Sequence, residues 1–246
     1  MLRAVTFDLW QTLILDTPEG LRQARADRVG GLRGVLAREG HRVDAADVER
    51  AYDAVGRGLE TVWAQRRDIG SRGQVRMLLE ALGIEGSVPS DGRVMDALDD
   101  AYRLPVLSSL PVPNAGAAEI LEELTRRGIR LALICNTGRT PGSMLRQVLD
   151  RLGLKAYLQV LTFSDEVGLR KPHPEIFSRT LAALGVSPAE SAHVGDDVTT
   201  DIAGARGIGM RPIHLCHPTG VSSQSDGALA ISRLEELPAV LFGEGS

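Results

Sequence analysis

Short apolar, β-like runs alternate with stretches of helical periodicity at the start of the chain and over its second half. The apolar runs predict strands at 4–8, 130–135, 158–163, 192–195 and 212–215. The periodic stretches predict helices at 115–127, 142–152, 173–184, 200–206 and 232–241. Strands that alternate with helices favour an α/β fold with a parallel sheet and right-handed crossovers.

Residues 17–107 have a different pattern, because they carry almost no strand signal. Apolar residues recur at helical spacing over 21–38, 45–65, 72–82 and 92–102, with glycines and a proline between these stretches. The pattern predicts four helices inserted after the first strand. We therefore expect one domain made of residues 1–16 and 108–246, and a second, all-helical domain made of residues 17–107.

Composition narrows the classes of function. A chain of 246 residues with 43% hydrophobic residues can bury a substantial core. The net charge is −4, and acids and bases are interspersed, so we expect no nucleic-acid partner and no membrane surface. No apolar run approaches the ~18 residues that a membrane span needs.

The chain also carries signals of its compartment. The first predicted strand begins almost at once, which leaves no room for a signal peptide. Cys135 and Cys216 have no framework spacing, as is usual in a reducing environment. We expect a cytoplasmic protein, a monomer or a homodimer, that acts on a small molecule.

Polar residues follow three of the predicted strands, where α/β folds place their ligands. Asp8 ends the first strand, Asn136 and Thr137 follow the second, and Asp196 and Asp197 follow the fourth. Asp201 lies further along the last of these segments. Lys171 is followed by Pro172 and Pro174, where a predicted helix begins.

These residues lie in the segments VTFDLWQTL, LALICNTG, GLRKPHPEIF and HVGDDVTTDIAGA, in that order. Together the four segments resemble the motifs of the haloacid dehalogenase (HAD) superfamily, over residues 1–16 and 108–220. The resemblance implies a Rossmann-like parallel-sheet core. It also implies that the helical insert is a cap of the C1 type.

The resemblance implies roles for the polar residues of those motifs. It implies that Asp8 is a covalent nucleophile and that Lys171 supplies a fixed positive charge beside it. It also implies a Mg²⁺ ion held by the carboxylates of Asp8 and Asp196 and the main-chain carbonyl of Trp10. Asp197 and Asp201 would be a further ligand and an orienting residue, although Asp201 is equally suited to the first turn of a helix.

The second motif departs from the family pattern. The family has Ser or Thr before the Asn, whereas this chain has Cys135, whose thiol is a weak donor. Thr137 points the same way if the strand continues, and could supply the hydroxyl. Alternatively, Cys135 is a buried apolar residue and the main chain of Asn136 binds the phosphate. Thr12 of the first motif is a further residue that we expect to bind the phosphate.

The first motif departs further. HAD phosphatases have a second Asp two residues after the nucleophile, where it protonates the leaving group. This chain has Trp10 instead. A missing general acid typically costs ~10²–10⁴ in rate. The indole either fills space beneath the cap or forms a stacking wall for the substrate.

Other polar residues carry weaker signals. His214, Cys216 and His217 lie together, but without partner ligands they do not predict a zinc site. Most arginines of residues 17–107 are balanced by acids. Arg22 and its neighbours Arg25 and Arg28 are candidates for binding an anionic substrate, because they follow the first motif closely.

Three functions compete. The acids at 196, 197 and 201 favour a Mg²⁺-dependent phosphohydrolase that acts on a small phosphorylated metabolite through an aspartyl-phosphate on Asp8. The aromatic residue at position 10 favours a 2-haloacid dehalogenase, which forms an aspartyl-ester. The third candidate is a non-catalytic protein that keeps the metal site.

Overall fold

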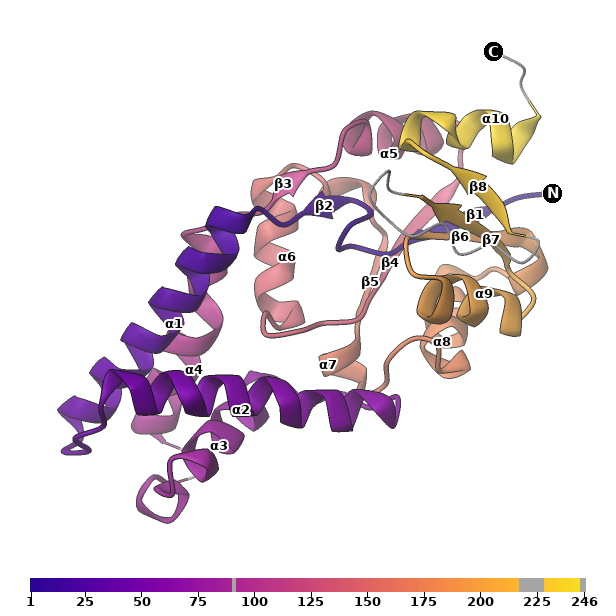
Figure 1. The fold of residues 1–246 in the computed structure, drawn as a ribbon. Helices are drawn as coiled ribbons and strands as arrows, with labels where there is room; N and C mark the ends of the chain where they lie inside the picture. The colour runs from indigo at the N-terminus through magenta and orange to yellow at the C-terminus, as the bar shows by residue number, and fades with distance from the viewer. Residues whose placement is uncertain (90–91, 217–227, 244–246) are drawn as a thin grey trace.

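A six-stranded parallel sheet forms the centre of the structure, which is a computed structural model that describes residues 1–89, 92–216 and 228–243. The strands run in the order β5-β4-β1-β6-β7-β8, and every neighbouring pair is parallel. Their bounds are β1 Ala4–Phe7, β4 Arg130–Cys135, β5 Val160–Phe163, β6 Ser191–Gly195, β7 Arg211–Leu215 and β8 Leu229–Ile231. The predicted α/β fold is confirmed (Figure 1).

The central strand β1 determines where the polar residues meet. Phe7 is in register with Leu133 of β4 on one side and with Val194 of β6 on the other. The residues that follow these three parallel strands therefore emerge at the same edge of the sheet. β1 is buried on both faces, which fits a sequence that is apolar except for Thr6.

Helices cover both faces of the sheet. Leu131, Leu133 and Cys135 share one apolar cluster with α5 (Ala117–Arg126), α6 (Gly142–Arg151) and α10 (Leu237–Phe242). Ile134 points to the other face, where it packs with α8 (Pro174–Leu184) and α9 (Ala203–Gly207). The alternation follows from the two-residue period of a strand.

The four predicted helices of the insert are present, at α1 Pro18–Arg38, α2 Ala45–Ala64, α3 Ser71–Ala81 and α4 Arg93–Arg103. Thr17 caps α1, because its Oγ1 accepts a hydrogen bond from Gly20 N at 3.0 Å. The insert has its own apolar cluster, to which Leu32, Leu59, Leu78 and Leu98 belong. Figure 1 shows the four helices gathered on one side of the molecule and the sheet on the other.

Three short strands have no counterpart among the predicted elements. β2 (Ile14–Leu15) and β3 (Val112–Pro113) pair in antiparallel fashion and bring together the two chain segments that lead into and out of the insert. β8 lies at the edge of the sheet and has only three residues. Segments this short have too few positions to show a periodic pattern. No helix among the described residues has the length and apolar character needed to cross a bilayer.

The separate apolar cluster of the helices supports the predicted division of the chain. We propose that residues 17–107 form a cap domain, and that residues 1–16 and 108–246 form the core domain.

Gly142, the first residue of α6, is expected to be essential for packing against β5. A Cβ at this position would lie 2.5 Å from Cγ of Phe163. Gly142→Ala should therefore lower the free energy of unfolding by about 1–3 kcal/mol, measured by denaturant titration. Gly30→Ala in α1 is the control, because a Cβ there meets nothing within 4 Å. Equal stability of the two variants would contradict this account of the packing.

Candidate active site

A buried lysine lies between two carboxylates at the carboxyl edge of the sheet. Lys171 Nζ is 2.5 Å from Asp8 Oδ1 and 2.6 Å from Asp201 Oδ1, and all three side chains are almost completely buried. Asp8 follows β1, and Asp201 lies in the turn Val198–Ile202 that precedes α9. The structure thus brings together three of the residues that the sequence singled out.

Burial and charge shift the pKa values of this group in different directions. Burial raises the pKa of Asp8 to about 7, although Lys171 opposes the shift. Burial would lower the pKa of Lys171, but Asp201 and Asp8 outweigh it and raise that pKa above its ordinary value. Burial would raise the pKa of Asp201, but Lys171 and His193 hold it well below its usual range. Lys171 is therefore a permanent cation that favours an ionised Asp201.

His193 of β6 contacts the carboxylate of Asp201 and holds it in place. Its Nε2–H donates to Asp201 Oδ1 at 3.0 Å, and its Nδ1 accepts from the hydroxyl of Thr6 at 2.7 Å. This assignment fits a neutral ring, because burial lowers the pKa of His193. Sequence reasoning missed His193, although it is a polar residue within an otherwise apolar strand.

Three acids are close enough to share a cation. Carboxylate oxygens of Asp8, Asp196 and Asp201 lie within 4.8 Å of one another. Hard oxygen donors of this kind suit Mg²⁺. A Cβ on Gly195 would lie 2.3 Å from Cγ of Asp201, so only glycine lets Asp201 approach the end of β6. The donor set and this close packing fit a divalent cation.

Asp197 lies outside this trio of acids. Its Oδ1 accepts hydrogen bonds from Thr199 N at 2.8 Å and Thr200 N at 2.7 Å, which makes it the N-cap of the following turn. Asp201 lies in the first turn of the same helical segment, as the alternative interpretation predicted, and its Oδ2 accepts a hydrogen bond from Asp197 N at 3.2 Å. Its Oδ1 at the same time contacts Lys171 and His193. The part of Asp197 in metal binding stays a prediction.

His214 holds the main chain of the loop that follows β6. Its Nε2 is 3.0 Å from Asp196 O, and its Nδ1 is 3.3 Å from Cys216 Sγ. His217, the third residue of that sequence cluster, lies outside the described residues. His214 therefore orients the loop that carries Asp196.

The second motif positions Lys171. Asn136 Oδ1 accepts a hydrogen bond from Lys171 N at 2.8 Å, and Asn136 Nδ2 donates to Lys171 O at 3.1 Å. Cys135 is fully buried in the apolar cluster, and burial raises the pKa of its thiol well above the usual range. Cys135 thus packs as a small apolar residue, one of the two alternatives that the sequence left open.

Two threonines that the sequence associated with phosphate have different surroundings. Thr137 Oγ1 is 3.1 Å from Asp68 Oδ2 and 3.1 Å from Ser164 Oγ, so its hydroxyl is engaged within the protein. Thr12 is fully buried, and its Oγ1 has no hydrogen-bond partner among the described residues. The phosphate-binding roles of both residues stay predictions.

Asp68, in the loop between α2 and α3, connects the insert to the core. Its buried carboxylate forms an ion pair with Arg170 Nη1 at 2.6 Å. Arg170 N also donates to Arg66 O at 3.0 Å, and Arg67 and Leu169 form an antiparallel bridge. The insert is therefore attached next to Lys171. Sequence reasoning missed Asp68, because no local pattern distinguishes it from the other acids of the insert.

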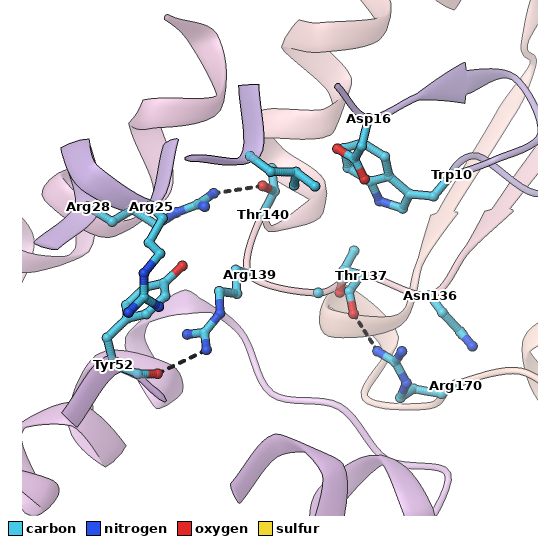
Figure 2. Close-up of a pocket in the computed structure, with 12 residues that line it drawn as sticks. Trp10, Asp16, Arg25, Arg28, Tyr52, Asn136, Thr137, Arg139, Thr140 and Arg170 are labelled. Carbon is cyan, nitrogen blue, oxygen red and sulfur yellow. Dashed lines mark hydrogen bonds between the residues drawn. The ribbon is translucent and has the colours of Figure 1, made fainter. Parts of the chain in front are cut away.

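A cavity of about 390 Å³ opens between the insert and the second motif (Figure 2). Trp10 and Asp16 lie on one side of it, and Arg25, Arg28 and Tyr52 from α1 and α2 lie on another. Of the three arginines considered from the sequence, Arg25 and Arg28 line the cavity. Arg22 instead forms an exposed ion pair with Glu19. The cavity is large enough for a small metabolite.

Removing Asp68 should leave Arg170 as an unpaired, largely buried charge. Asp68→Ala is expected to lower the free energy of unfolding by about 3–5 kcal/mol, measured by denaturant titration. Asp96→Ala removes the partner of Arg72 in an exposed pair of the same insert, and should cost less than about 1 kcal/mol. Losses of similar size would show that the Asp68–Arg170 pair does not stabilise the attachment.

Comparison with known proteins identifies the family. A model of haloacid dehalogenase-like hydrolases matches residues 2–209. A phosphoserine phosphatase of Thermus thermophilus is 32% identical, with 99% of each chain covered, and a ribulose-1,5-bisphosphate 5-phosphatase of Halopiger xanaduensis is 31% identical over 93% of this chain and 90% of the relative. The structure of a 2-haloacid dehalogenase from Pseudomonas syringae superposes with a TM-score of 0.71 at 27% identity, covering 98% of each chain. The chain belongs to the haloacid dehalogenase-like hydrolases.

Proposed function

We propose that this hydrolase is a Mg²⁺-dependent phosphohydrolase that acts on a small phosphorylated metabolite through an aspartyl-phosphate on Asp8. The observation that carries the proposal is the trio Asp8, Asp196 and Asp201 next to Lys171. Phosphoryl groups carry several negative charges, so a site for them needs fixed cations. Relatives that are phosphatases, covered over nearly their whole length, support the same reading.

The chain's own residues supply the nucleophile and its surroundings. A carboxylate oxygen of Asp8 attacks phosphorus, the bond from phosphorus to the ester oxygen breaks, and the leaving oxygen takes up a proton. Water then attacks the aspartyl-phosphate, loses a proton and releases inorganic phosphate and the free carboxylate. Lys171 holds positive charge beside Asp8 throughout, because Asp201 and Asn136 fix its position.

The carboxylates of Asp8, Asp196 and Asp201 would hold Mg²⁺, with the Trp10 carbonyl and Asp197 as the further ligands expected from the family pattern. The bound cation would neutralise charge on the phosphoryl oxygens.

Trp10 limits which esters react well. The indole packs partly against the core cluster and lines the cavity, where it offers no proton to a leaving group. Substrates with good leaving groups, such as acyl phosphates, depend less on an acid. We therefore expect low activity on simple alkyl phosphates.

A 2-haloacid dehalogenase is the second candidate, and the observation that favours it is also Trp10. An aromatic residue replaces the second acid, and the 2-haloacid dehalogenase structure matches nearly the whole chain. Displacement of halide needs no proton donor, and it does not need a divalent cation.

A substrate panel separates the two activities. Phosphate esters, an acyl phosphate and 2-haloacids should be assayed with Mg²⁺ and with a chelator. The proposal expects Mg²⁺-dependent phosphate release, whereas halide release that is insensitive to the chelator would support the dehalogenase.

Asp196→Ala should weaken Mg²⁺ binding by about 100-fold or more, measured by titration calorimetry, because it removes a carboxylate from the trio. Asp150→Asn is the control, since Asp150 pairs with Lys155 at the surface. Asp197→Asn, measured in parallel, decides whether Asp197 is a ligand as well as a cap. Unchanged affinity in Asp196→Ala would refute the metal site.

Trp10→Asp should restore a proton donor on the leaving-group side. Hydrolysis of alkyl phosphates should rise by ~10-fold or more, with a smaller gain for aryl phosphates. Trp10→Asn is the matched control, because it opens the same space without supplying an acid. Asp8→Asn should abolish turnover of every phosphate ester. A gain that is equal in the Asp and Asn variants would mean that space, not the proton, limits the wild-type protein.

A further inference from the structure

The cavity beside Trp10 has an excess of positive charge. Its charged lining residues are Arg25, Arg28, Arg139, Arg170 and a single acid, Asp16. Two of the guanidinium groups already form ion pairs with acids outside the cavity lining. Arg25 pairs with Asp53 at 2.5 Å, and Arg170 pairs with Asp68 at 2.6 Å. Arg28 and Arg139 form no salt bridge with any acid of the described ranges.

Arg28 is held in place by neutral groups. Its side chain is almost fully buried, its Nε donates to Tyr102 O at 2.8 Å, and its Nη2 donates to Thr140 Oγ1 at 3.0 Å. A guanidinium group has five N–H donors, so these two bonds leave donors available. Asp16 interacts with Arg28 through its charge, since Arg28 opposes the rise that burial causes in the pKa of Asp16, but no ion pair joins the two side chains. A buried cation without an ion-pair partner is costly, and an anion in the cavity would offset that cost.

Arg139 is fixed equally well and faces the same cavity. Its Nη1 donates to Tyr102 Oη at 2.9 Å and its Nη2 donates to Tyr52 O at 2.9 Å, while its Cζ lies 3.7 Å from the centre of the Tyr52 ring. A Cβ on Gly56 would lie 2.7 Å from Arg139 Nη2, so the close approach to α2 depends on that glycine. Both guanidinium groups are thus preorganised, which favours binding of an anion.

The position of this pair relative to Asp8 sets its role. Figure 2 shows Trp10 and Asn136 on one side of the cavity, and Arg28, Arg139 and Tyr52 on the other. Trp10 follows Asp8 by two residues, and Asn136 holds Lys171. Asp8 and Lys171 do not themselves line this cavity, but Trp10 and Asn136 do. A molecule whose phosphate reaches Asp8 past these two residues would extend across the cavity toward the two arginines.

We propose that Arg28 and Arg139 form a subsite for a second anionic group, so that the substrate is a phosphate ester that also carries a carboxylate or a second phosphate. The inference rests on the proposed phosphohydrolase function, because it takes the phosphate at Asp8 as the first anionic group.

Phosphonates test the subsite without any turnover. Calorimetry with Mg²⁺ present compares 3-phosphonopropionate and propane-1,3-bisphosphonate with propylphosphonate, which lacks the second anion. Both probes with a second anionic group, or the one of the preferred class, should bind wild type about 10-fold or more tightly than propylphosphonate. Which probe gains more distinguishes a carboxylate from a second phosphate.

Two variants locate the preference at Arg139. Arg139→Gln should reduce it to within about 3-fold, because the charge-assisted bonds are lost. Gly56→Ala keeps every charge but displaces the Arg139 guanidinium, and should also reduce the preference. Arg33→Gln removes an exposed arginine of α1 that does not line the cavity, and should leave the preference unchanged.

The outcomes separate the subsite from the proposed function. Equal binding of all three phosphonates by wild type overturns the subsite. No measurable binding of 3-phosphonopropionate or of propane-1,3-bisphosphonate overturns it too. A preference that survives in both Arg139→Gln and Gly56→Ala overturns it as well. Mg²⁺-dependent phosphate release is assayed separately with the substrate panel described above, the acyl phosphate included. A binding preference without phosphate release from any member of that panel supports the subsite and refutes the phosphohydrolase.

Discussion

The ion pairs of Lys171 with Asp8 and Asp201 are the interaction on which the rest of the site depends. Each of these three groups would be unstable alone in its buried position, and together they compensate one another. Their contacts explain much of the surrounding structure. Asn136 fixes the main chain of Lys171, His193 holds Asp201, and Gly195 leaves room for the Asp201 carboxylate. The sheet register then keeps these groups at one edge, because β4, β1 and β6 are neighbours.

The second constraint is the attachment of the helical insert. The chain enters the insert after β2 and leaves it before β3, and these two strands pair with each other. The insert also contacts the core through the buried Asp68–Arg170 pair. The first contact fixes where the insert begins and ends. The second places the end of α2 beside the loop that carries Lys171. The cavity between these two contacts is therefore walled by both parts of the chain.

Much of the fold could be predicted from the sequence, because its central strands β1, β4 and β6 are buried on both faces. The apolar runs of β1 and β4 predict such strands, whereas β2, β3 and β8 are too short to show a periodic pattern of apolar residues. Asp8, Lys171, Asp196 and Asp201 could be found because each stands at a recognisable end of a strand or helix. Asp68 and Arg139 could not, since their partners are far away in sequence. Thr137, for example, is 69 positions from Asp68.

The stacking of Arg139 on Tyr52 has a consequence for energetics. Arg139 follows β4, whereas Arg28 and Tyr52 belong to the inserted helices. A molecule that bound both guanidinium groups would therefore gain free energy only while the two parts of the chain stay together. By thermodynamic linkage, association of the two parts strengthens binding by the same factor by which binding strengthens that association. Affinity for such a molecule would then be set partly by residues that never touch it, among them Asp68 at the far contact between insert and core.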